Sequence, residues 1–95
     1  MKVTHVLISG EVQGVGFRSY MRSHGRKLGL VGWVRNLPEG TVEAEFAGPE
    51  ESVNRLVQLC KRGPFLAQVL SVDVNVAEKD FPYEDFELRK DEVLL

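Results

Sequence analysis

The sequence has little of several features that mark particular classes of protein. Its one cysteine, Cys60, cannot form an internal disulfide, which predicts a reducing compartment. A net charge of −2 gives no basic surplus and argues against a general nucleic-acid binder. No apolar run approaches the ~18 residues of a membrane span, and the start lacks the apolar stretch of a signal peptide. The 95 residues are therefore expected to form one soluble, cytoplasmic domain (1–95) and a monomer, with no nucleic-acid or membrane partner.

The apolar pattern predicts strands and helices in a definite order. Strands are predicted at residues 3–8, 30–36, 41–47 and 69–76, and a short edge strand within 84–90. One helix is predicted from Phe17 to Leu28, with Gly29 closing it, and a second lies within residues 48–64. The buried stripe of the second helix is expected to comprise Val53, Leu56, Val57 and Cys60.

This order favours an α+β, ferredoxin-like βαββαβ fold, with an antiparallel sheet of four to five strands and both helices on one face. A right-handed crossover through the first helix leaves a gap that the strand at 41–47 fills. The strands at 3–8 and 30–36 then run parallel and end at the same edge. The loop after the first strand, the start of the first helix and Asn36 are therefore expected to lie close together. Glu43 and Glu45 fall on the polar face of their strand and are expected to be solvated.

Three glycines precede an arginine in the stretch GEVQGVGFR: Gly10, Gly14 and Gly16 before Arg18. Without Cβ atoms, the backbone N–H groups can turn inward, and the helix N-terminus adds more donors. The planar guanidinium of Arg18 suits phosphate oxygens. Alternatively, the glycines only tighten a corner and Arg18 is a solvated charge. Arg22 and Arg26 share its helix face, either as a basic approach to the site or as a solvated surface.

Other phosphate and nucleophile motifs do not match. A Walker loop needs Gly-Lys-Ser/Thr, but Phe17 and Arg18 follow Gly16. A dinucleotide fingerprint needs a glycine where Ser19 stands. Cys60 lies on an apolar helix stripe and is interpreted as an inert core thiol. The spacing of the acidic, histidine and cysteine residues does not match a metal site.

Two long motifs resemble those of the acylphosphatase family. GEVQGVGFR (10–18) fits its first motif, G-x-V-Q-G-V-x-F-R, at each fixed position, and GWVRNLPEGTVEAEFAG (32–48) fits its second. The resemblance runs nearly end to end and implies a ferredoxin-like fold and hydrolysis of acyl phosphates to carboxylate and inorganic phosphate, without a metal or cofactor. It implies that Arg18 and Asn36 are catalytic, Asn36 by orienting water. The implied phosphate-binding loop comprises Gly10, Glu11, Val12, Gln13, Gly14, Val15 and Gly16.

Two features depart from the pattern of the family. Gly25 stands where members commonly carry alanine, and close packing against the sheet is its expected reason. The segment KDEVLL (90–95) prolongs the C-terminus.

Two rival functions are weighed beside hydrolysis. A non-catalytic anion-binding module would keep the loop and Arg18 but would not need Asn36. A related alternative is a domain of a larger carbamoyl-phosphate enzyme, which the short chain disfavours. An RNA-binding domain with the same element order would need exposed aromatic residues on its first and third strands, and the pattern at 41–47 does not supply them.

Overall fold

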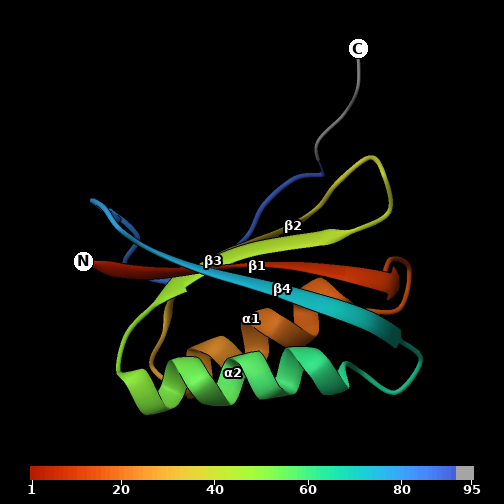
Figure 1. Ribbon diagram of the computed structural model, residues 1–95, viewed down its shortest axis with the longest axis horizontal. Helices are drawn as coiled ribbons and strands as arrows, with labels where there is room; N and C mark the ends of the chain where they lie inside the picture. Colours follow the sequence, from red (N-terminus) through yellow and green to blue (C-terminus); the bar gives the residue numbers. More distant parts are fainter. Residues whose placement is uncertain (92–95) are drawn as a thin grey trace.

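The computed structural model describes residues 1–91 and contains a five-stranded sheet with two helices (Figure 1). The elements in chain order are β1 (Lys2–Glu11), α1 (Phe17–Lys27), β2 (Val31–Asn36), β3 (Val42–Ala47), α2 (Glu50–Arg62), β4 (Gln68–Glu78) and β5 (Phe86–Leu88). The order matches the prediction. The first strand is longer than the predicted 3–8, since it runs from Lys2 to Glu11.

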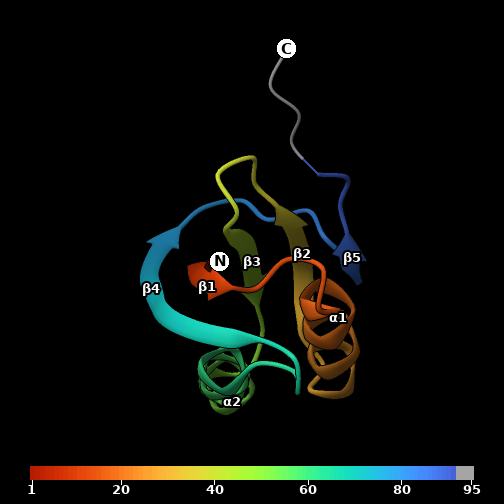
Figure 2. The ribbon, with the colours of Figure 1, turned by 90° about the vertical axis from the view of Figure 1, so that its right-hand side faces the viewer.

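The sheet has the strand order β4-β1-β3-β2-β5. β3 pairs antiparallel with both β1 and β2, so it fills the predicted gap and leaves β1 and β2 parallel to each other. β4 pairs antiparallel with β1. The fifth strand departs from the predicted antiparallel sheet, because β5 pairs parallel with β2. Its direction follows from the chain path, since the segment after β4 crosses the sheet before reaching the edge beside β2 (Figure 2).

Both helices cover the same face of the sheet, as predicted (Figure 2). The core between these layers is apolar, and Val42, Ala44 and Phe46 of β3 all point into it. α2 contributes Leu56, Leu59 and Cys60. The predicted stripe missed Leu59, and it included Val53 and Val57, which are only partly buried and pack at the margin of this core. The predicted fold is therefore confirmed, with corrections to the direction of β5 and to the buried stripe of α2.

The opposite face of the sheet carries an ion-pair network where solvated carboxylates were predicted. Glu43 accepts hydrogen bonds from His5 at 2.8 Å and from Arg35 at 2.8 Å. Burial alone would raise the pKa of Glu43, but these two hydrogen bonds outweigh it and hold the pKa below its ordinary value. Glu45 pairs with Lys79 in the segment that crosses this face. The two carboxylates bind neighbouring side chains and are only partly exposed, so the prediction was wrong for both.

Gly25 has the packing reason that the sequence predicted. A Cβ atom at this position would lie 2.4 Å from the ring of Phe86, a residue of β5 that is fully buried. The absence of a side chain therefore lets α1 approach β5 closely. Glycine lowers the intrinsic stability of the helix, and the close packing of α1 against β5 requires it.

Candidate active site

A small pocket lies where the loop after β1, the start of α1 and the end of β2 meet. Its volume is about 90 Å³. It is lined by Val12, Gly14, Gly16, Phe17, Arg18, Ser19 and Asn36. Sequence reasoning expected these separate stretches to meet at one edge of the sheet, and the structure brings them together there.

The two glycines that line the pocket owe their identity to backbone conformation. Gly14 has φ 74° and Gly16 has φ 79°, both in the left-handed region that side chains disfavour. A Cβ atom at either position would meet no atom within 4 Å, so crowding is not the reason. Gly16 is the N-cap of α1 and, having no side chain, leaves the first helical N–H groups uncapped. The pocket therefore lies against backbone donors that have no acceptor within the helix and no side-chain cap.

The start of α1 also has the electrostatic character of an anion site. Its first turn contains no acidic residue, so the positive end of the helix dipole is not neutralised by the helix itself. The first intrahelical hydrogen bond runs from the N–H of Tyr20 to the carbonyl of Gly16 at 3.0 Å. The N–H groups of residues 17–19 precede it and have no acceptor within the helix.

Some members of the predicted loop do not line the pocket. Gly10 and Glu11 belong to β1 and pair with β4. A Cβ atom on Gly10 would lie 2.2 Å from the carbonyl oxygen of Gln68, so this glycine permits close contact with β4. The pairing register shifts between Ser9 and Gly10, as at a β-bulge. The part of the predicted loop beside the pocket therefore begins at Val12.

Gln13 has a role that sequence reasoning did not assign. Its side-chain amide donates hydrogen bonds to the carbonyl of Leu37 at 2.8 Å and to that of Thr41 at 2.9 Å. Leu37 and Thr41 flank the turn between β2 and β3. Gln13 therefore ties the glycine loop to the hairpin that carries Asn36. Val15, the remaining loop residue, is partly buried and packs against the core.

Arg18 and Asn36 approach the pocket from α1 and β2. The side chain of Arg18 is 31% exposed, and Asn36 is 9% exposed on the same face of β2 as the core residue Val34. Sequence reasoning did not single out a third polar residue beside them. Asp91 accepts a hydrogen bond from Nη1 of Arg18 at 2.8 Å, and its other oxygen lies 3.5 Å from Nδ2 of Asn36. No sequence motif marks this aspartate, which lies in the C-terminal segment KDEVLL; residues 92–95 of that segment lie outside the described part of the chain.

The structure does not support Arg26 as part of a positively charged surface that leads the substrate to the pocket. Its guanidinium donates two hydrogen bonds to Asp85, at 3.0 and 2.9 Å. These bonds hold the pKa of Asp85 below its ordinary value. The charge of Arg26 is thus already paired at the opposite end of α1 from the pocket.

Burial and placement also describe the cysteine and the acidic and histidine side chains. Cys60 is buried in the core, and burial raises the pKa of its thiol to about 12. It is therefore an inert core thiol, as the sequence predicted. Within residues 1–91, no group of three or more His, Cys, Asp or Glu residues is placed to hold a metal ion. None of the described helices is long and apolar enough to cross a membrane.

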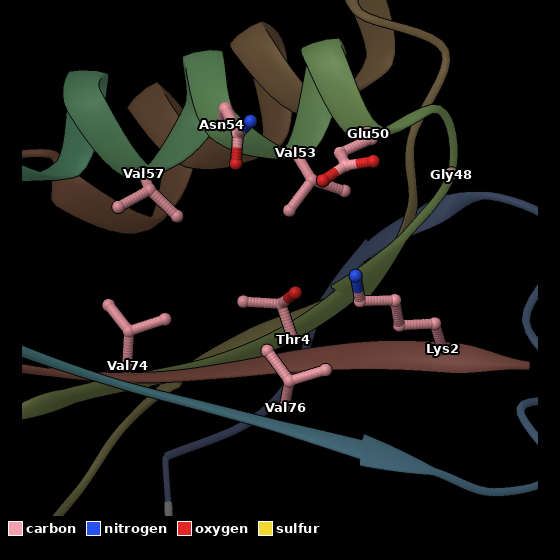
Figure 3. Close-up of a pocket in the computed structure, with 9 residues that line it drawn as sticks. All are labelled: Lys2, Thr4, Gly48, Glu50, Val53, Asn54, Val57, Val74 and Val76. Atoms are coloured by element: carbon pink, nitrogen blue, oxygen red, sulfur yellow. The ribbon is translucent and has the colours of Figure 1, made fainter.

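A larger hollow of about 200 Å³ lies at the other end of β1, between α2 and the sheet (Figure 3). Its walls include the apolar side chains Val53, Val57, Val74 and Val76. Lys2 brings a positive charge to its rim, but Glu50 brings a negative one. The lining lacks the glycine loop and arginine that suit a phosphoryl group, so the smaller pocket is the candidate active site.

Comparison with known proteins agrees with this fold and shows the family. The family model for acylphosphatase matches residues 4–88. A curated acylphosphatase from Caldivirga maquilingensis is 51% identical over 87 residues, covering 90% of this chain and 92% of that protein. The crystal structure of acylphosphatase from Bacillus subtilis superimposes with a TM-score of 0.90 at 30% identity, covering 94% of this chain and 99% of that one.

The same fold also occurs inside a larger protein. Full-length HypF, in a phosphate- and nucleotide-bound form, matches with a TM-score of 0.85 at 29% identity. This match covers 96% of the present chain but only 12% of HypF. The curated relative, in contrast, matches over almost its whole length. The chain belongs to the acylphosphatase family and hydrolyses the carboxyl–phosphate bond of acyl phosphates.

Proposed function

We propose that the small pocket binds the phosphoryl group of the substrate. The backbone donors of the loop and of the first turn of α1 would hold its oxygens, and the positive end of the helix dipole, which has no acidic residue in its own first turn, would favour their negative charge. The observation that carries this proposal is the meeting of Gly14, Gly16, Arg18 and Asn36 around one pocket. These residues come from two stretches of sequence, which a corner that merely reversed the chain would not need.

Arg18 is proposed to stabilise the transition state. Phosphoryl transfer passes through a loose transition state in which charge spreads over three equatorial oxygens. A guanidinium presents several N–H donors in a fixed plane and stays charged at any working pH. The contact with Asp91 uses only Nη1, which leaves the other donors of Arg18 to face the phosphoryl oxygens.

Asn36 is proposed to orient the attacking water. Its amide can both donate to and accept from a water molecule, and its position at the end of β2 is nearly buried. The water oxygen forms a bond to phosphorus while the bond from phosphorus to the carboxyl oxygen breaks and the carboxylate leaves with the electron pair. The proton of the water passes to an oxygen of the substrate phosphate, which gives inorganic phosphate.

The leaving group explains why so few residues suffice. The conjugate acid of a carboxylate has a pKa of about 4–5, by analogy with glutamic acid, so the carboxylate leaves without a general acid. A catalytic histidine or pair of carboxyl groups is therefore not required. We propose that the reaction also proceeds without a metal ion, and unchanged turnover in EDTA is the expected result.

The cellular setting is also a proposal. A single domain of residues 1–95 that acts as a cytoplasmic monomer, without nucleic-acid or membrane partners, fits a single cysteine that cannot form an internal disulfide and the net charge of −2. The substrate is a small acyl phosphate. Sedimentation analysis at assay concentrations tests the monomer directly.

The replacement Asn36→Ala separates catalysis from binding. We expect kcat to fall by roughly 100-fold or more, because a reacting group that is no longer positioned loses a large part of its rate advantage. Inorganic phosphate should still inhibit competitively with a similar Ki, because the backbone donors and Arg18 remain. The assay measures phosphate release from benzoyl phosphate, beside the melting temperature of each variant.

Two outcomes would contradict the role of Asn36. If kcat is retained in the folded variant, Asn36 does not position the water. If kcat falls only in proportion to the loss of folded protein, the amide is a structural cap before the turn at residues 37–40.

The rival function, a binding module without catalytic activity, predicts that even the unmodified chain releases no phosphate.

A further inference from the structure

Asp91 contacts both of the side chains that are proposed to carry out the reaction. Its Oδ1 accepts from Nη1 of Arg18 at 2.8 Å. Its Oδ2 lies 3.5 Å from Nδ2 of Asn36, at the long limit of a hydrogen bond. Arg18 is 73 residues away in the sequence and Asn36 is 55 residues away. One carboxylate thus links the first turn of α1 to the end of β2.

We propose that Asp91 is a positioning residue for the hydrolysis, which holds the guanidinium of Arg18 and the amide of Asn36 in their working arrangement before substrate binds. This proposal rests on the roles proposed for Arg18 and Asn36. A long, partly exposed arginine side chain has many rotamers, and a charged partner restricts them. A carboxylate also fixes which way the Asn36 amide faces, because it can only accept hydrogen bonds.

The segment that carries Asp91 is itself anchored, so the carboxylate has a defined position. β5 pairs with β2 up to Leu88, and the N–H of Arg89 donates to the carbonyl of Val34 at 2.9 Å. The guanidinium of Arg89 lies over the ring of Trp33, 4.5 Å from its centre. These contacts fix the chain two residues before Asp91 to the same strand that ends in Asn36.

The placement of Asp91 favours positioning over blocking of the pocket. Asp91 is not among the residues that line the pocket, although it contacts two residues that do, Arg18 and Asn36. Its side chain is 50% exposed, so water and salt screen its negative charge from an incoming anion. A carboxylate that competed with phosphate would instead have to occupy the pocket.

The test compares Asp91→Ala and Asp91→Glu with Glu87→Gln as a matched control. Glu87 is an exposed carboxylate on β5, and its replacement removes one negative charge from the same segment. For each variant, kcat and KM are measured with benzoyl phosphate, Ki with inorganic phosphate, and the melting temperature by circular dichroism. Asp91→Glu keeps the carboxylate on a longer side chain and tests for rescue.

We expect Asp91→Ala to lower kcat by about 10-fold or more, because misplacing a reacting group by about 1 Å can cost about 100-fold. Its melting temperature should equal that of Glu87→Gln, and Asp91→Glu should recover part of the lost kcat. The Ki for phosphate should stay close to that of the unmodified chain, because the backbone donors are unchanged.

Two results would overturn the proposal. A kcat of Asp91→Ala equal to that of Glu87→Gln would show that the contact does not position the site. A higher kcat together with a lower phosphate Ki would show that Asp91 competes with the substrate. Failure of this inference is distinguishable from failure of the proposed function. If Asn36→Ala and Arg18→Gln lower kcat and Asp91→Ala does not, only the role of Asp91 is wrong.

Discussion

α1 begins after a glycine in the left-handed conformation and has no acidic residue in its first turn, whereas α2 begins after Pro49 and carries Glu50 and Glu51 there. Both N-termini have the same positive dipole end and the same unpaired N–H groups. In α2 the helix supplies its own carboxylates. In α1 these groups stay available to a ligand, beside Arg18. The two helix starts therefore differ in charge, and only the start of α1 lacks a carboxylate of its own beside the pocket.

The two helix starts also lie at opposite ends of the strands of the sheet. α1 follows β1 and α2 follows β3, and these strands are antiparallel (Figure 1). The C-terminal end of β2, which carries Asn36, lies at the same end of the sheet as the start of α1. The 200 Å³ apolar hollow lies at the other end, where α2 begins. Strand direction therefore brings the glycine loop, Arg18 and Asn36 together at one end of the sheet, and the helix starts differ accordingly.

The largest expected effect comes from Arg18→Gln, which removes the one cationic side chain that lines the pocket within the described residues. We expect kcat to fall by about 10²–10³, the usual cost of losing one donor at an anionic transition state, and phosphate inhibition to weaken. Arg55→Gln is the matched control, because Arg55 is an exposed residue of α2 and does not line the pocket. Arg55→Gln should leave kcat and the Ki for phosphate nearly unchanged. Equal losses in the two variants would show that only the net charge of the protein matters.

Much of this site could be predicted from the sequence because its parts are local or follow from topology. The spacing of Gly14, Gly16 and Arg18 indicates a loop that enters a helix, and the βαββαβ order brings Asn36 to the same edge. The contacts of Gln13 and Asp91 were not predictable in this way. They join residues far apart in the chain and depend on the direction in which side chains point.

The direction of β5 was missed for a similar reason. This strand has only three residues and follows an irregular segment, so its pairing depends on where the chain crosses the sheet and not on a local pattern. The role of Gly10 was also hidden. A glycine that faces a ligand and one that permits close contact with β4 look alike in the sequence. They differ in the folded protein, where a side chain on Gly10 would bring its Cβ within 2.2 Å of the carbonyl oxygen of Gln68.

A smaller effect is expected where the two helix caps differ in backbone conformation. Gly16→Ala places a Cβ on a residue with φ 79°, which should cost about 1–2 kcal/mol of unfolding free energy. Pro49→Ala should cost less, about 0.4–1 kcal/mol, because φ −56° suits alanine and only the rigidity of proline is lost. Urea unfolding of both variants measures the two costs. A loss at Gly16 no larger than that at Pro49 would contradict the conformational reason given for this glycine.

The smallest effect is expected from making the start of α1 resemble that of α2. Ser19 is exposed, lines the pocket and lies in the first turn of α1, so Ser19→Glu introduces the carboxylate that α2 already has. Repulsion of about 1 kcal/mol between unit charges about 4 Å apart in water should raise the phosphate Ki roughly fivefold. The same carboxylate favours the helix dipole, so stability should stay the same or rise by about 0.3–1 kcal/mol. Ser19→Gln, of similar size and without charge, is the control for steric effects. If Ser19→Gln raises the Ki as much as Ser19→Glu does, or if Ser19→Glu leaves the Ki unchanged, then the missing negative charge at this helix start does not explain anion binding.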